Sequence, residues 1–79
     1  MTQEEEQYYE TYFDLFASDG WKQFVNEITE IHDGYKIEHI KDDKDLNRIK
    51  GERAILFRMM RFDTSIKSTY DLIKEKSGD

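Results

Sequence analysis

The chain of 79 residues contains no cysteine and no proline, and only four of its residues are glycine. Without cysteine it forms no disulfide and offers no thiolate to a nucleophilic, zinc or iron–sulfur site. Proline and glycine are the residues that end helices and build tight turns, so their scarcity argues against sandwiches, barrels and loop-rich scaffolds. The composition therefore favours helices.

Long apolar runs are also missing. No stretch approaches the ~20 consecutive apolar residues that a membrane-spanning helix needs. The first six residues, MTQEEE, are acidic, whereas a signal or transit peptide is basic in this region. We therefore expect a protein that is neither secreted nor membrane-spanning, and hydrophobic types at 37% of the chain predict a small core.

Acidic side chains outnumber basic ones, and the formal net charge is −6. The excess lies at the N-terminal end, because residues 1–19 hold six acids and no lysine or arginine, whereas residues 42–79 hold nine bases and eight acids. Nucleic acid and anionic lipid repel such a chain on average, so protein partners are favoured. The 14% of aromatic residues are too many for a disordered chain.

Apolar residues recur with helical spacing in three segments, which predict helices at about 3–17, 20–35 and 43–76, with a connector at 36–42. Thr2 and Glu5 form a capping box, Asp19 is the expected N-cap of the second helix, and Asp42 or Asp43 that of the third. We expect a single all-α domain over residues 1–79 with one long C-terminal helix. Its arrangement is an antiparallel, coiled-coil-like helical hairpin kinked at Gly20, or a compact three-helix bundle.

Five apolar side chains lie off the main stripes of these helices and need a cover. A first helix folded over the others would supply it in a three-helix bundle, and a second copy of the chain would supply it in an oligomer. Oligomerisation is a common remedy for a core this small. The five are Tyr8, Leu15, Ile55, Phe57 and Leu72.

Aromatic residues are concentrated near the N-terminus, with six of the eleven within fourteen residues. They are either core or a docking surface, since tyrosine and tryptophan are enriched at interface hot spots. Neither interpretation is catalytic. The candidates for interaction are Tyr8, Tyr9, Tyr12, Phe13, Phe16 and Trp21.

Basic residues cluster on one sector of the predicted third helix, and Arg53, Arg58 and Arg61 are the candidates there. A solvated or salt-bridging face is the first interpretation, and Glu52 and Asp63 dilute the patch as a phosphate site. Pairing with the acidic first helix of a neighbouring copy is the functional alternative. It predicts a head-to-body, salt-sensitive homo-oligomer.

Familiar catalytic and metal-binding patterns are absent, so we expect no enzyme and no cofactor. The sequence from Asp43 to Asn47 opens like a calcium loop, but Arg48 and Ala54 stand where that loop requires glycine and glutamate. His32 and His39 lack further ligands at metal-binding spacing, and no histidine lies near Ser65 or Ser68. For Gly51 we expect a close approach by Phe24 or Trp21, and the alternative is a backbone approach by a partner helix.

Several short segments together resemble small helical proteins of tailed, podovirus-like bacteriophages. The resemblance covers about residues 8–73, and it implies a viral protein in a virion or in the host bacterial cytoplasm, without transferring any site residue. The segments are Tyr12–Phe16, Gly20–Phe24, Lys50–Glu52, Phe62–Ile66 and Tyr70–Asp71.

Two functions fit these expectations. In the first, the chain is a virion component, an interaction module that packs on itself and on portal, capsid or ejection proteins. In the second, it is an early phage protein whose acidic first helix binds and inhibits or redirects a host protein. Neither requires catalysis.

Overall fold

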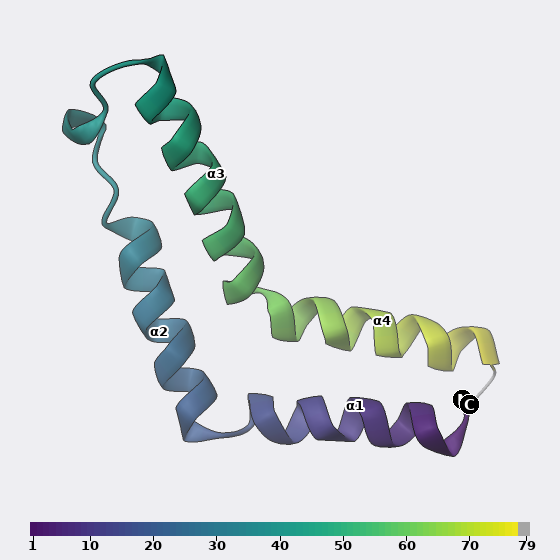
Figure 1. The fold of residues 1–79 in the computed structure, drawn as a ribbon. Coiled ribbons are helices and arrows are strands. Elements are labelled where there is room, and N and C mark those ends of the chain that lie inside the picture. Colours follow the sequence, from purple (N-terminus) through teal and green to yellow (C-terminus); the bar gives the residue numbers. More distant parts are fainter. Residues whose placement is uncertain (78–79) are drawn as a thin grey trace.

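The computed structural model describes residues 1–77, which form four α-helices and one short 3₁₀ turn (Figure 1). No strand occurs among these residues, so the predicted all-α class is confirmed. The elements are α1 (Gln3–Phe16), α2 (Asp19–Asp33), η1 (Ile37–His39), α3 (Asp43–Met60) and α4 (Phe62–Ser77).

Side-chain caps define where three of the helices begin. The Thr2 hydroxyl oxygen accepts a hydrogen bond from the Glu5 backbone N–H at 3.1 Å, and the Asp42 carboxylate accepts one from the Asp45 N–H at 2.8 Å, as the sequence predicts. The prediction for α2 was wrong by one residue. Ser18 has extended backbone and its hydroxyl accepts from the Trp21 N–H at 3.1 Å, so Asp19 is already helical. Serine caps as well as aspartate does.

The predicted long helix over 43–76 is divided. α3 ends at Met60, Arg61 adopts φ −107° and ψ 14°, and α4 begins at Phe62 in a new direction. No glycine or proline causes this bend. The Phe62 ring lies 5.4 Å from Tyr12 and 5.9 Å from Phe16, measured between centroids, so aromatic packing accounts for the change of direction better than local propensity does.

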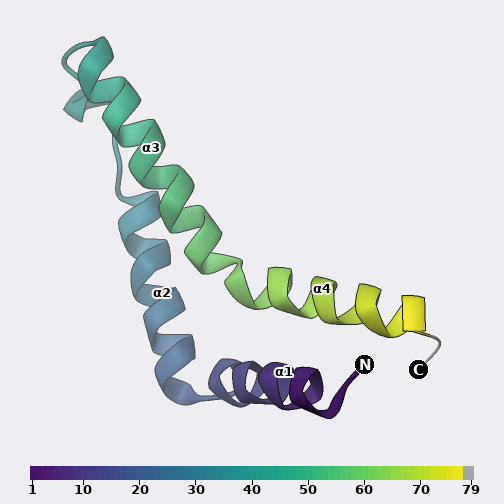
Figure 2. The same cartoon turned by 45° about the vertical axis from the view of Figure 1, so that its right-hand side comes forward.

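The first half of the chain also bends, at a position that faces the division between α3 and α4 (Figure 1). The break lies at Ala17 and Ser18, between α1 and α2, and the predicted kink at Gly20 was therefore misplaced, because Gly20 lies inside α2. Figures 1 and 2 show α2 alongside α3 and α1 alongside α4, each pair antiparallel, with α1 and α2 on the outer side of the bend. The molecule thus consists of two arms of two helices each.

The resulting shape is thin. Its principal extents are 52 × 27 × 15 Å, and the smallest is little more than the ~10–12 Å diameter of one helix with its side chains. The radius of gyration is 17.1 Å, whereas a compact domain of this length has about 12 Å. Among the described residues only Tyr9, Ile28 and Ile49 are buried. A single layer of helices has almost no interior.

Candidate interaction surface

The aromatic cluster of α1 forms most of the seam with α4. Tyr9 and Phe13 both contact Tyr70, at 5.2 and 5.1 Å between ring centroids, and Tyr12 contacts Phe62. Tyr9 is buried and the other ring positions of this seam are half-buried. Four of the six aromatic candidates, Tyr9, Tyr12, Phe13 and Phe16, are therefore mainly core.

The remaining two aromatic candidates lie outside this seam. Tyr8 is 53% exposed and stacks edge-on against Tyr9 and Tyr12. Trp21 is half-buried at the bend, where its ring lies 5.0 Å from Phe16 and 5.6 Å from Phe24.

The three arginine candidates are exposed and lie towards the end of α3. The guanidinium of Arg61 lies 5.7 Å from the centre of the Phe57 ring, in a cation–π contact. Arg53 and Arg58 make no ion pair within the part of the chain that the structure describes. These side chains are available to an acidic partner.

The five acids of α1 are exposed along the whole helix. None of the ion pairs within residues 1–77 involves them, because these pairs join Arg48 to Asp45 and Glu52, and His32 to Asp33. α1 thus presents a concentrated negative charge to solvent.

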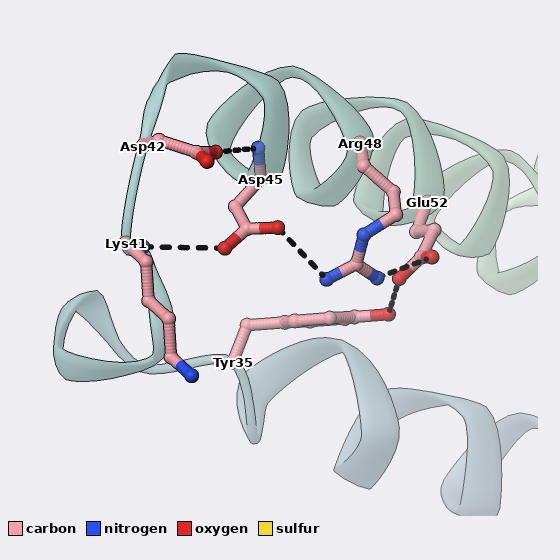
Figure 3. A network of polar contacts seen from close by, with 6 residues as sticks. All are labelled: Tyr35, Lys41, Asp42, Asp45, Arg48 and Glu52. Atoms are coloured by element: carbon pink, nitrogen blue, oxygen red, sulfur yellow. Dashed lines mark hydrogen bonds and ion pairs between the residues drawn. The ribbon is translucent and has the colours of Figure 1, made fainter.

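A polar network fastens the end of α2 to α3 (Figure 3). The Tyr35 hydroxyl donates a hydrogen bond to Glu52 at 2.6 Å, and Arg48 donates to the other oxygen of the same carboxylate at 2.9 Å. Asp45 lies 3.9 Å from Arg48 and accepts from the Lys41 backbone N–H at 3.4 Å. The hydrogen bond from Tyr35, and then Arg48, lower the pKa of Glu52, while that same bond raises the pKa of Tyr35. The network holds two helices in register.

Nine large apolar side chains are exposed among the described residues, and the five that the sequence places off the stripes are all among them, at 45–60% exposure. The other four are Phe24, Ile31, Ile37 and Met59. Three of these four belong to the main apolar stripes of the sequence and were therefore expected in the core. They are exposed because a helix in a two-helix layer buries a narrower stripe than a helix in a bundle. Ile37, in the predicted connector at 36–42, is 87% exposed.

Seven of these nine side chains lie on the same side of the layer. The buried Ile28 of α2 and Ile49 of α3 mark the side on which these two helices contact each other. Successive residues of a helix are about 100° apart around its axis, so the other positions can be placed relative to these two. Four exposed side chains of α2 and α3 lie on the same flank of the contact. By the same reasoning from Tyr9 and Phe62, three more fall on one flank of α1 and α4. We call this set the apolar face. It consists of Tyr8, Leu15, Phe24, Ile31, Ile55, Met59 and Leu72.

A hollow of about 260 Å³ lies on the apolar face at the bend. Its lining is almost entirely apolar and includes residues of both arms, since Phe62 belongs to α4 and Phe24 to α2. Arg58 lies at its rim, so one candidate arginine and the candidate Trp21 meet here. The lining residues are Trp21, Phe24, Arg58, Met59 and Phe62.

The opposite face carries a second hollow of about 480 Å³ near the tip of the α2–α3 arm. The exposed Ile37 and Phe57 line it together with Lys50 and Arg53. This hollow is more polar than the one at the bend and has a basic rim.

Gly51 does not receive an aromatic side chain. A Cβ atom built on it meets nothing within 4 Å, so the expected contact with Phe24 or Trp21 was wrong. The reason is its position on the helix, because Gly51 lies two residues after the buried Ile49 and thus faces away from α2.

Asp43 and Asp45 lie in the first turn of α3, where acids complement the helix dipole. Among the described residues, no group of three or more histidine, cysteine or carboxylate side chains could hold a metal ion. Within that same range, no helix combines the length and the apolar character that crossing a membrane would require.

Comparisons with known proteins add no relative. No protein-family model, no curated protein and no solved structure matches the chain.

Proposed function

We propose that this chain is a non-enzymatic helical interaction protein that assembles with copies of itself as a component of a bacteriophage particle. The observation that carries the proposal is the amount of surface left uncovered. The accessible area is 6427 Å², whereas a compact monomer of 9.6 kDa exposes about 5,100 Å². The difference of about 1,300 Å² exceeds the ~800 Å² that each partner buries in a standard interface.

The kind of surface supports the same proposal. The apolar face gathers seven large side chains on one side of a layer in which three of the described residues are buried. Contiguous apolar surface of this kind marks interaction sites in soluble proteins. In the proposal the subunit is a bent antiparallel helical hairpin, and assembly supplies the second layer that its core lacks.

The choice of a phage particle rests on the sequence resemblance alone. A thin helical subunit with one apolar side suits packing in many copies on a portal, on a capsid or on internal ejection proteins. The expected localisation is the virion, after synthesis in the host bacterial cytoplasm.

Co-purification with particles tests this function. The proposal predicts that an antibody against the chain detects it in gradient-purified, nuclease-treated phage, and that Tyr8→Glu on the apolar face reduces its incorporation. Glu38→Gln, in the exposed turn η1, is the matched control and leaves incorporation unchanged. Absence of the protein from intact particles would overturn the virion assignment.

A second candidate function is favoured by α1. Its five acids are exposed and make no ion pair within the described residues, so α1 could occupy a basic groove of a host protein. This function predicts capture of one host protein from lysate. Capture would be lost when Glu4, Glu5, Glu6 and Glu10 are changed to glutamine, and kept when Glu27 and Glu30 of α2 are changed instead.

A further inference from the structure

We infer that the α2–α3 part of the apolar face is the contact with a second copy of this chain, and that two α2–α3 arms close into a four-helix bundle. In this dimer α2 of each copy lies on α3 of the other. The inference deepens the proposed function and rests on it, because it names the partner and the surface.

The first support is the position of four exposed side chains on this arm. Phe24 and Ile31 of α2, and Ile55 and Met59 of α3, are 40%, 58%, 60% and 38% exposed and lie on the same flank. They follow the i, i+4 and i, i+7 spacings of a second apolar stripe, beside the one that joins α2 to α3. A helix with two adjacent apolar stripes is typical of a bundle of four, where each helix contacts two neighbours.

The levels of these side chains along the arm also match. Phe24 and Met59 line the same hollow at the bend, and Tyr35 is hydrogen-bonded to Glu52 at the other end of α2. Ile31 and Ile55 lie between these two contacts, and therefore at about the same height. When α2 of one copy lies on α3 of the other, Ile31 comes opposite Ile55 of the second copy.

The net charges of the whole helices favour this arrangement over the other ways in which two copies could join their apolar faces. α2 holds four acids and one lysine, a net charge of −3, and α3 holds five bases and three acids, a net charge of +2. A two-fold axis along the arm places each acidic helix on a basic one. A two-fold axis that placed the α2–α3 arm of one copy on the α1–α4 arm of the other would instead bring α1, with five acids and no base, onto the acidic α2.

A two-fold axis along the arm also gives each neighbouring pair of helices an antiparallel orientation. α2 and α3 are antiparallel within one copy (Figure 1), and the axis preserves helix direction, so α2 is antiparallel to the α3 on which it lies. The four helices then alternate in direction, which is the common topology of four-helix bundles. The contact is self-complementary and closes at two subunits.

Cysteine cross-linking tests the inference, since the chain has no cysteine of its own. Ile31→Cys and Ile55→Cys are made as separate proteins and oxidised alone and as an equimolar mixture. We expect the mixture to form a disulfide-linked dimer at least about 5-fold faster than either variant alone, because only the mixed pair places its Cβ atoms within disulfide reach.

A substitution series separates this contact from self-association in general. Ile55→Glu should raise the dimer dissociation constant about 100-fold by placing a charge in the bundle. Leu72→Glu, 55% exposed on the other arm, is the matched control and should change it less than about 3-fold. Both sites are exposed in the monomer, so neither change prevents folding, and circular dichroism checks this.

Each outcome decides a different claim. If the wild type associates but Ile55→Glu leaves its mass unchanged, or the mixture links no faster than the single variants, this interface is wrong and the proposed function stands. If the wild type is a monomer at every concentration, self-association and this interface both fail.

Discussion

Tyr35, Arg48 and Glu52 show how single residues set the register of the α2–α3 arm. The pKa of Glu52 is held below 4.5, so this carboxylate stabilises the fold above that pH and loses its contribution as pH falls through the lowered pKa. The pKa of Tyr35 is raised above 10.0, so its contribution is complete below that pH and is lost as pH rises further. The network is therefore fully effective between these two values.

Replacing Tyr35 tests this reasoning. Tyr35→Phe should lower the urea midpoint near neutral pH, and the difference from the wild type should shrink as the pH falls through the lowered pKa of Glu52 and this carboxylate takes up a proton. In a Glu52→Gln background, the change in urea midpoint caused by Tyr35→Phe should be the same at neutral and at acid pH. A difference that is constant from neutral to acid pH in the wild-type background would contradict the assignment.

Gly51 offers a second test at this scale. Its Cβ position is open and α3 is regular there, so Gly51→Ala should raise the free energy of unfolding of the monomer by about 1 kcal/mol. Thermal unfolding of a dilute sample measures this. Gly34→Ala is the control, because its Cβ would lie 3.1 Å from the Glu30 carbonyl oxygen, and no such gain is expected.

The beginnings and ends of the helices could be predicted from the sequence wherever a local signal marks them. Thr2 and Asp42 cap the helices that follow them, and the predicted start of α1 is correct. The division at Arg61 could not be predicted, because no local residue requires it. It depends on Phe62 meeting Tyr12 and Phe16, residues almost fifty positions away in the chain.

The cap of α2 controls the bend between the two outer helices. Ser18→Ala removes the acceptor of the Trp21 N–H and should lower the free energy of unfolding by about 1 kcal/mol. Asp19→Ala, beside it, keeps this cap and should cost less. A larger loss in Asp19→Ala than in Ser18→Ala, measured by urea unfolding, would mean that Asp19 is the cap.

Phe62 connects the two arms. Its ring contacts Tyr12, Phe16 and Trp21, so Phe62→Ala should lower the free energy of unfolding by about 2–3 kcal/mol. Thr64→Ala, two residues further along α4 at an exposed position, provides the reference. A cost below about 0.5 kcal/mol for Phe62→Ala would show that the bend does not depend on this cluster.

At the scale of the whole molecule, the arrangement of the helices in one layer determines which apolar side chains are exposed. The sequence indicates some of these exposed residues and misses others. The five off-stripe residues, which by the sequence need a cover, are exposed in the monomer, because nothing in a single layer covers a second stripe. Phe24, Ile31 and Met59 were not predicted to be exposed, since helical spacing alone does not tell how many neighbours a helix has. The six aromatic candidates divide into four seam residues, the exposed Tyr8 and the half-buried Trp21 at the bend.

The measurement that tests the proposed self-association most directly is the absolute mass of the wild-type protein by light scattering, across a wide range of concentration at low and high salt. We expect a multiple of 9.6 kDa that dissociates on dilution and weakens as salt rises, because apolar burial and acid–base pairing act together. A constant mass of 9.6 kDa under all these conditions would contradict the proposal.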